Sequence, residues 1–223
     1  MQIQAKSNNR VEILLYEDIG GWFGITADEF VREVKSAAKD KTDIDLRINS
    51  NGGNVFDGVA IYNYLRSAPQ KVTVHIDGIA ASIASIIAMA GDTINMADNA
   101  WMMIHDPWIV AMGTATELRD VAETMDGIRD TLLDTYMKRA TKERKEISDM
   151  MAAETWLKAP DALAAGLADE VTGTMDVAAS IHKDWFKNPP QNLAKDAPRP
   201  RRDFADKAFD RMALALRRIS TTH

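Results

Sequence analysis

Cysteine is absent from this 223-residue sequence, and only four histidines occur in it. The lack of cysteine excludes disulfides, thiolate nucleophiles and cysteine-bound metals, and it suits a reducing cytoplasm. The sequence also contains no HExxH motif, no close histidine cluster, no P-loop and no GxGxxG motif. We therefore expect neither a metal nor a nucleotide cofactor.

Long hydrophobic runs are missing too. The longest uncharged stretch, GIAASIASIIAMAG at residues 78–91, is 14 residues long, whereas a membrane-spanning helix needs about 20. The N-terminal stretch MQIQAKSNNRVEILLY lacks the apolar core of a signal peptide. We expect a cytoplasmic protein with no membrane partner, in which residues 81–91 form a buried helix.

Acidic residues outnumber basic ones, and the net charge is −6. The negative charge lies in the body of the chain, because residues 181–223 contain ten Lys and Arg against five Asp and Glu. An acidic body argues against nucleic acid as a partner. The length and the 46% hydrophobic content fit one substantial domain with an appendage.

Strand-like and helix-like stretches alternate along the first half of the chain. Strands are expected at residues 11–16, 43–49, 71–76 and 100–105, and helices at 26–39, 55–67 and 81–91. Thr26 and Glu29 have the spacing of a capping box at the first helix. This alternation predicts an α/β fold with right-handed crossovers and a mostly parallel sheet.

One helical pattern is unusually long, from about residue 114 to residue 142. Its apolar residues share a face: Leu118, Val121, Ala122, Met125, Ile128, Leu132, Leu133 and Tyr136. At 1.5 Å per residue such a helix is roughly 40 Å long, more than one small core can cover. We expect it to protrude and to bury its apolar stripe against another subunit.

The C-terminal part differs in composition from the rest. The stretch KNPPQNLAKDAPRPRRD, at residues 187–203, is rich in proline and charge, as linkers are. The residues that follow fit an amphipathic helix, acidic early and basic late. We therefore expect a domain at residues 1–175, a linker at 176–202 and a C-terminal helix or tail at 203–223.

A few polar residues and glycines stand at the ends of the expected strands. Gly52 and Gly53 suit either a tight turn or a bare backbone that offers N–H groups to an oxyanion. Ser82 is either a helix N-cap or a nucleophile near a helix N-terminus. His105 follows an apolar run, and Glu154 precedes an aromatic-aliphatic pair. Together these residues could supply a nucleophile, a base, an acid and oxyanion donors, and the order Ser, His, Glu is admissible for a triad.

Four motifs carry a resemblance to a known family. They are RINSNGG at residues 47–53, DGIAASIAS at 77–85, MMIHDPW at 102–108 and ETWLKAPDALAAGLAD at 154–169. In this order they resemble the ClpP-type serine peptidases, and most closely the ClpP-related head maturation (prohead) proteases of tailed phages. The likeness covers about residues 10–173. It implies a ClpP/crotonase-like fold with repeated β-β-α or βα units and a long protruding helix.

The resemblance also implies roles for single residues. Ser82 matches the nucleophile and His105 the general base, while the backbone N–H groups of Gly53 and Ile83 match the oxyanion donors. Glu154 stands where many Clp peptidases have aspartate, so its longer side chain must approach the histidine from a slightly different backbone position. Asn51 stands where the family often has proline, which loosens the turn but keeps the N–H donors.

The implied activity is that of a serine endopeptidase with an acyl-enzyme intermediate, acting on phage capsid or scaffold proteins during head maturation. The implied location is the host cytoplasm or the assembling head, and the implied assembly is a ring-shaped homo-oligomer. Because the chain begins almost directly at its first strand, we expect no ATP-dependent unfoldase as a partner.

Two alternatives stay open at this point. One is a crotonase-like enzyme acting on acyl-CoA thioesters, which would use the same paired-amide oxyanion site but generally relies on carboxylates. The Ser/His pairing counts against it. The other is a non-catalytic head-assembly subunit, against which the presence of Ser82, His105 and the two glycines argues.

Overall fold

The computed structural model describes residues 1–5, 9–21, 24–176, 181, 185–190 and 193. Its strands are β1 (Gln2–Ala5), β2 (Arg10–Leu15), β3 (Asp43–Ser50), β4 (Lys71–Ala81), β5 (Thr93–Ala97), β6 (Trp101–Ile104), β7 (Thr155–Lys158) and β8 (Glu170–Thr172). Its helices are α1 (Ala27–Ala37), α2 (Val55–Ser67), α3 (Ile83–Ala88), α4 (Ala115–Met137), α5 (Arg144–Ala152) and α6 (Ala159–Ala164). None of the helices in this part of the chain is long and apolar enough to cross a membrane.

The strands form one mixed sheet in the order β1-β2-β3-β4-β5-β8, with β6 beside β4 and β7 beside β6. All neighbouring pairs are parallel except β1 with β2 and β6 with β7. The predicted α/β class with a mostly parallel sheet is therefore confirmed. The capping box at Thr26 is confirmed as well, with the Thr26 hydroxyl accepting from the Glu29 N–H.

Strand β4 is longer than the sequence pattern indicated. Its first half pairs with β5 and its second half, Ile79–Ala81, pairs with β6, where a loop was expected at residues 77–80. Asp77 and Gly78 give this stretch the composition of a turn. In the structure Asp77 is buried and paired with the guanidinium of Arg47, so the polar residue stays inside a strand. As a result Ser82, which directly follows β4, lies beside the end of β6.

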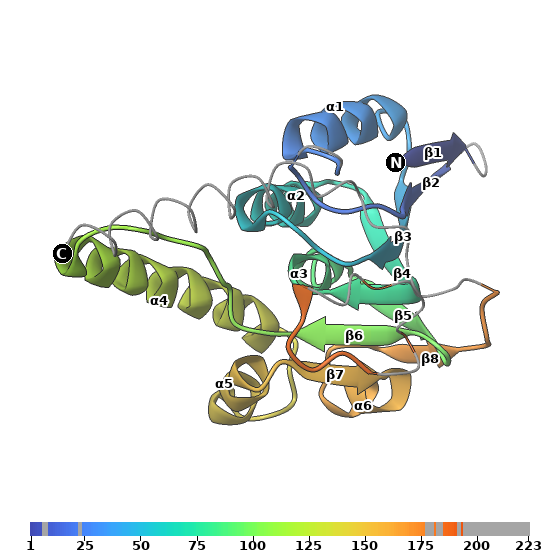
Figure 1. Cartoon of the computed structure of the whole chain (residues 1–223). Helices are drawn as coiled ribbons and strands as arrows, with labels where there is room; N and C mark the ends of the chain where they lie inside the picture. Colours follow the sequence, from blue (N-terminus) through green and yellow to red (C-terminus); the bar gives the residue numbers. More distant parts are fainter. Residues whose placement is uncertain (6–8, 22–23, 177–180, 182–184, 191–192, 194–223) are drawn as a thin grey trace.

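Helix α4 leaves the sheet and extends away from it (Figure 1). Only its C-terminal part is buried, through Leu132, Leu133, Thr135 and Tyr136, while Leu118 near its start is 41% exposed. The helix ends at Met137, not at residue 142, and α5 follows from Arg144 with its own capping box, formed by Glu143 and Glu146. The apolar stripe predicted on this helix is thus buried at one end of it and largely uncovered at the other.

Part of the predicted linker at residues 176–202 packs on the sheet. Ile181, Phe186 and Leu193 are buried in a second apolar cluster, against Ile79, Ala81 and Met103 of β4 and β6. The expected amphipathic helix at residues 203–223 lies outside the described residues.

Candidate active site

Ser82 occupies a strained turn between β4 and α3. Its φ of 55° and ψ of −129° are uncommon for a residue with a side chain and have to be held by the surrounding structure. The Ser82 N–H donates to the Met103 carbonyl of β6 at 3.0 Å. Gly52 packs against the same turn, since a Cβ on it would lie 2.8 Å from the Ser82 Cβ and 2.6 Å from the Ala81 oxygen. The turn is therefore fixed from both sides, with the Ser82 hydroxyl facing a cavity.

His105 directly follows β6, which lies parallel to β4, so the ends of the two strands meet at one edge of the sheet. The Ser82 Oγ and the His105 Nε2 are 2.7 Å apart and share a hydrogen bond. Burial lowers the pKa of His105; the carboxylates of Glu154 and Asp106 raise it, and the Lys187 ammonium lowers it. The net lowering favours the neutral imidazole, which is the form that can accept a proton.

The two backbone groups expected as oxyanion donors lie beside the same serine. Gly53 has a φ of 142°, and a Cβ on it would come within 2.1 Å of the Ile19 carbonyl oxygen, so the position requires glycine. Ile83 is the first residue of α3, and the first N–H groups of a helix have no partner within it. Among the described residues no hydrogen bond occupies the N–H of Gly53 or of Ile83. Both are available for an acceptor on a substrate.

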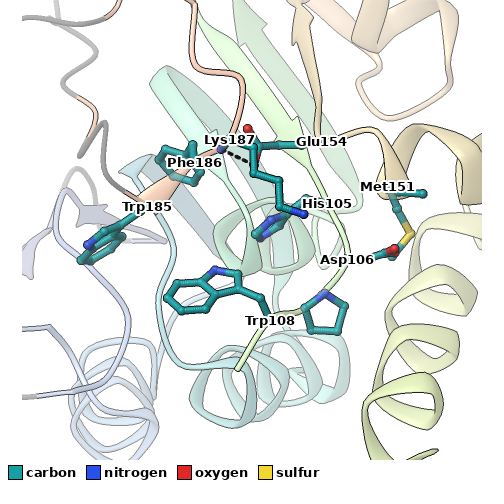
Figure 2. A pocket seen from close by; sticks show the side chains of 10 residues that line it. His105, Asp106, Trp108, Met151, Glu154, Trp185, Phe186 and Lys187 are labelled. Atoms are coloured by element: carbon teal, nitrogen blue, oxygen red, sulfur yellow. Dashed lines mark hydrogen bonds between the residues drawn. The ribbon is translucent and has the colours of Figure 1, made fainter. Parts of the chain in front are cut away.

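Glu154 lies beside His105 because β6 and β7 pair antiparallel, with Ile104 opposite Thr155. Its side chain is buried, and its φ is 52°. The Oε2 atom accepts from the Lys187 N–H at 2.8 Å (Figure 2), and Oε1 accepts from the Asn188 N–H at 2.7 Å. Among the described residues no hydrogen bond joins Glu154 to His105; the two interact through charge. The carboxylate is thus held next to the imidazole by a segment much later in the chain.

Two cavities share His105 as a lining residue. One, of about 350 Å³, is lined by Asn51, Gly53, Val55, Ser82, His105, Pro107, Trp108, Trp185 and Phe186. The other, of about 330 Å³, lies on the Glu154 side and shares Trp108, Trp185 and Phe186. Within the described ranges no group of three His, Asp or Glu residues is placed to hold a metal ion.

The sequence did not predict two parts of this site, one a segment and the other a single residue. The first is the Trp185–Asn188 stretch, whose composition resembled a linker and gave no signal beyond two adjacent aromatic residues. The second is Ser85, whose Oγ donates to the Ser82 carbonyl at 2.6 Å and also bonds the Tyr136 hydroxyl at 2.7 Å. Ser85 is fully buried, so it supports the Ser82 turn and is poorly placed to attack a substrate.

Comparison with known proteins shows the family of the chain. The family model for Clp protease matches residues 24–175. The chain belongs to the Clp protease family. It is 32% identical over 133 residues to the ATP-dependent Clp protease proteolytic subunit 1 of Protochlamydia amoebophila, an alignment covering 58% of this chain and 65% of that protein.

A second relative gives a similar result. The chain is 33% identical over 131 residues to the ATP-dependent Clp protease proteolytic subunit of Deinococcus radiodurans, covering 58% of this chain and 64% of that protein. The chain therefore spans slightly less than two thirds of the length of these curated relatives. All five candidate residues, Gly53, Ser82, Ile83, His105 and Glu154, fall within the family match, whereas Trp185–Asn188 lies beyond it.

Proposed function

We propose that this Clp-family protein is a serine endopeptidase with Ser82 as its nucleophile and His105 as its general base. The observation that carries the proposal is the 2.7 Å hydrogen bond between the Ser82 Oγ and the His105 Nε2, at a strained turn facing a cavity. A nucleophile within hydrogen-bond reach of a neutral base is the arrangement that activates serine. The membership of the Clp protease family supports the same activity and disfavours the crotonase-like alternative.

The proposed reaction has two halves. His105 takes the proton of Ser82 as the Oγ attacks the peptide carbonyl, and the N–H groups of Gly53 and Ile83 donate to the oxyanion that forms. The imidazolium then gives its proton to the leaving amine as the C–N bond breaks, which leaves an acyl-enzyme. In the second half His105 takes a proton from water, the hydroxide attacks the ester, and the proton returns to Ser82 as the acid is released.

Glu154 is the proposed third member of the site. Its carboxylate already raises the pKa of His105 against the effects of burial and of Lys187. A negative charge at this place stabilises the imidazolium that forms in both halves of the reaction. Glutamate is one methylene longer than aspartate, so its side chain needs an additional restraint to hold the carboxylate beside the imidazole.

The proposed substrates are proteins of an assembling phage head, either capsid or scaffold, cleaved in the host cytoplasm or within the head itself. This part of the proposal rests on the motif resemblance to head maturation proteases. We further propose a ring-shaped homo-oligomer that works without an ATP-dependent unfoldase. Support comes from the uncovered apolar residues just before and at the start of α4, with Val110 68% and Met112 74% exposed, which a second subunit would cover.

The test of the activity compares Ser82→Ala with Ser85→Ala on an unfolded protein substrate. Loss of triad residues typically costs several orders of magnitude in rate, so Ser82→Ala should abolish cleavage while the oligomer mass stays that of the parent. Ser85→Ala should keep measurable cleavage. Cleavage by Ser82→Ala within a few-fold of the parent, or turnover of acyl-CoA thioesters without peptide cleavage, contradicts the proposal.

A further inference from the structure

The residues Trp185–Asn188, which we name the C-terminal strap, cross the active site although they lie outside the part of the chain that matches the Clp protease family. The strap binds Glu154 through its backbone. The N–H groups of Lys187 and Asn188 each donate to a different oxygen of the same carboxylate, at 2.8 and 2.7 Å. The Trp156 indole N–H adds a longer contact to Oε1 at 3.4 Å.

The strap is anchored by an aromatic side chain at the centre of the site. Phe186 is only 9% exposed. Its ring meets the Trp156 ring edge-on at a centroid distance of 5.1 Å and the His105 ring at 6.4 Å, which are favourable aromatic geometries. Phe186 also belongs to the second apolar cluster, together with Ile181 and Leu193 on either side of the strap. The backbone donors at Lys187 and Asn188 are therefore fixed relative to the sheet.

The strap leaves the nucleophile open. The cavity of about 350 Å³ that reaches Ser82 is lined by Trp185 and Phe186 of the strap together with Gly53 and Ser82. The hydrogen bond between Ser82 and His105 is intact in the presence of the strap. The strap thus forms a wall of the substrate cavity, and it does not plug it.

We propose that the C-terminal strap is a positioning element of the active site: the N–H groups of Lys187 and Asn188 hold the Glu154 carboxylate beside His105, and Trp185 and Phe186 complete the substrate cavity. The proposal rests on the serine endopeptidase function proposed above. An ionised carboxylate has about four acceptor positions, so two backbone donors leave capacity for the N–H of the His105 ring. The restraint that the longer glutamate side chain needs is supplied by this segment.

The substitution that removes one donor is Asn188→Pro, since proline has no N–H. Asn188→Ala is its matched control, because it changes the side chain and keeps the N–H. A hydrogen bond to a charged group, once lost, corresponds to roughly a tenfold or larger change in rate. We expect Asn188→Pro to lower kcat by about tenfold or more with KM within about twofold, and Asn188→Ala to resemble the parent.

A double-mutant cycle separates positioning of Glu154 from a general structural effect. If the strap acts through Glu154, Asn188→Pro should cost less than about twofold in a Glu154→Gln background. Phe186→Ala, with Phe186→Leu as its control, provides a second way to release the strap if Asn188→Pro fails to fold. An increase of activity on release would identify the strap as a blocking segment and overturn the proposal, as would equal losses in Asn188→Pro and Asn188→Ala.

The contact itself is measured by hydrogen exchange in the full chain, without any need for activity. In a peptide spanning residues 185–190 the last two residues are prolines and the first two lose their label during the measurement, so the signal reports the amides of Lys187 and Asn188. We expect slow exchange in the parent and faster exchange in Glu154→Ala. Equal exchange in the two proteins would overturn the strap proposal, even if peptide cleavage is confirmed. Conversely, the parent protein could show slow exchange that depends on Glu154 and yet cleave no peptide. That result would support the contact and contradict only the proposed function.

Discussion

The two halves of the candidate site are held in different ways. The pair of Ser82 and His105 is positioned by the sheet, because β4 and β6 run parallel and end side by side, and the Ser82 N–H is bonded to β6. Glu154 also starts from the sheet, at the beginning of β7, but its carboxylate is directed by backbone groups of the C-terminal strap. The proposed nucleophile and base thus depend on residues within the family match, and the proposed third member depends on residues beyond it.

This difference indicates which part of the site tolerates change. The Ser82 turn is surrounded by backbone atoms at short distance, and packed backbone cannot relax around an added side chain. The two shorter hydrogen bonds to the Glu154 carboxylate come from the C-terminal strap, and single substitutions in the strap can weaken them without disturbing the sheet. Changes at the turn should therefore have larger effects on activity than changes at the strap.

Among substitutions outside the proposed triad, the largest effect is expected for Gly52→Ala, which changes the turn that holds Ser82. Gly52 has a φ of 95°, and its added Cβ would meet the Ala81 oxygen at 2.6 Å and the Ser82 Cβ at 2.8 Å. Strain at such a position, together with displacement of the nucleophile, should lower kcat by at least about 100-fold. Gly127→Ala, at an exposed helical position with open space around it, is the control and should keep full activity. Comparable activities of the two variants would show that the turn is not rigid.

A smaller loss is expected for Glu154→Gln in the half held by the strap. Both carboxylate oxygens accept a backbone N–H, so the NH₂ of glutamine would face a donor and the charge opposite the imidazolium would be lost. We expect kcat to fall by roughly ten- to 100-fold, less than for Ser82→Ala. Asp149→Asn is the control, because Asp149 is bonded to Lys145 on the exposed face of α5. Should Asp149→Asn be the more damaging change, Glu154 is not the third member.

The smallest effect concerns Lys187 and appears in the pH profile. The pKa of His105 is lowered, and burial is the largest cause. The carboxylates of Glu154 and Asp106 raise this pKa, and the Lys187 ammonium lowers it. Since the proposed mechanism uses His105 in its neutral form, we expect activity to fall as the pH drops through this pKa. Lys187→Met removes a cause of the lowering while keeping the backbone N–H, so the acidic limb of kcat/KM should move to higher pH. Lys145→Met should leave the limb in place, and a shift of the Lys187→Met limb to lower pH would contradict the assignment.

The sequence predicted the strands that lead to Ser82 and His105, but it did not predict how they pair. Alternating strand and helix patterns predicted β2, β3, β4 and β6, whereas the grouping of Ser82, His105 and Glu154 into one site rested on the motif resemblance, because the pairing of β4 with β6 leaves no local signal. Strand β4 was predicted too short because Asp77 looks like a turn residue until its partner Arg47 is known. Such pairings between distant residues leave no periodic signal in a single sequence.

The strap escaped prediction for a related reason. Its contacts with Glu154 are made by backbone N–H groups, which every residue except proline carries, so no side-chain pattern marks them. The neighbouring prolines and charges gave the segment the composition of a linker. Burial of Phe186 against β6 and β7 depends on the three-dimensional position of Trp156, which the local sequence does not encode.

The most direct test of the central claim is to map the residue that a serine-directed fluorophosphonate modifies in the full chain. The account predicts a single adduct on Ser82, lost in Ser82→Ala and strongly slowed when the pH falls below the pKa of His105. Ser85 should remain unmodified, since it is buried and bonded to Tyr136. An adduct on Ser85 or on any other residue, or no adduct on a folded protein at neutral pH, would contradict the assignment of Ser82 and His105 as nucleophile and base.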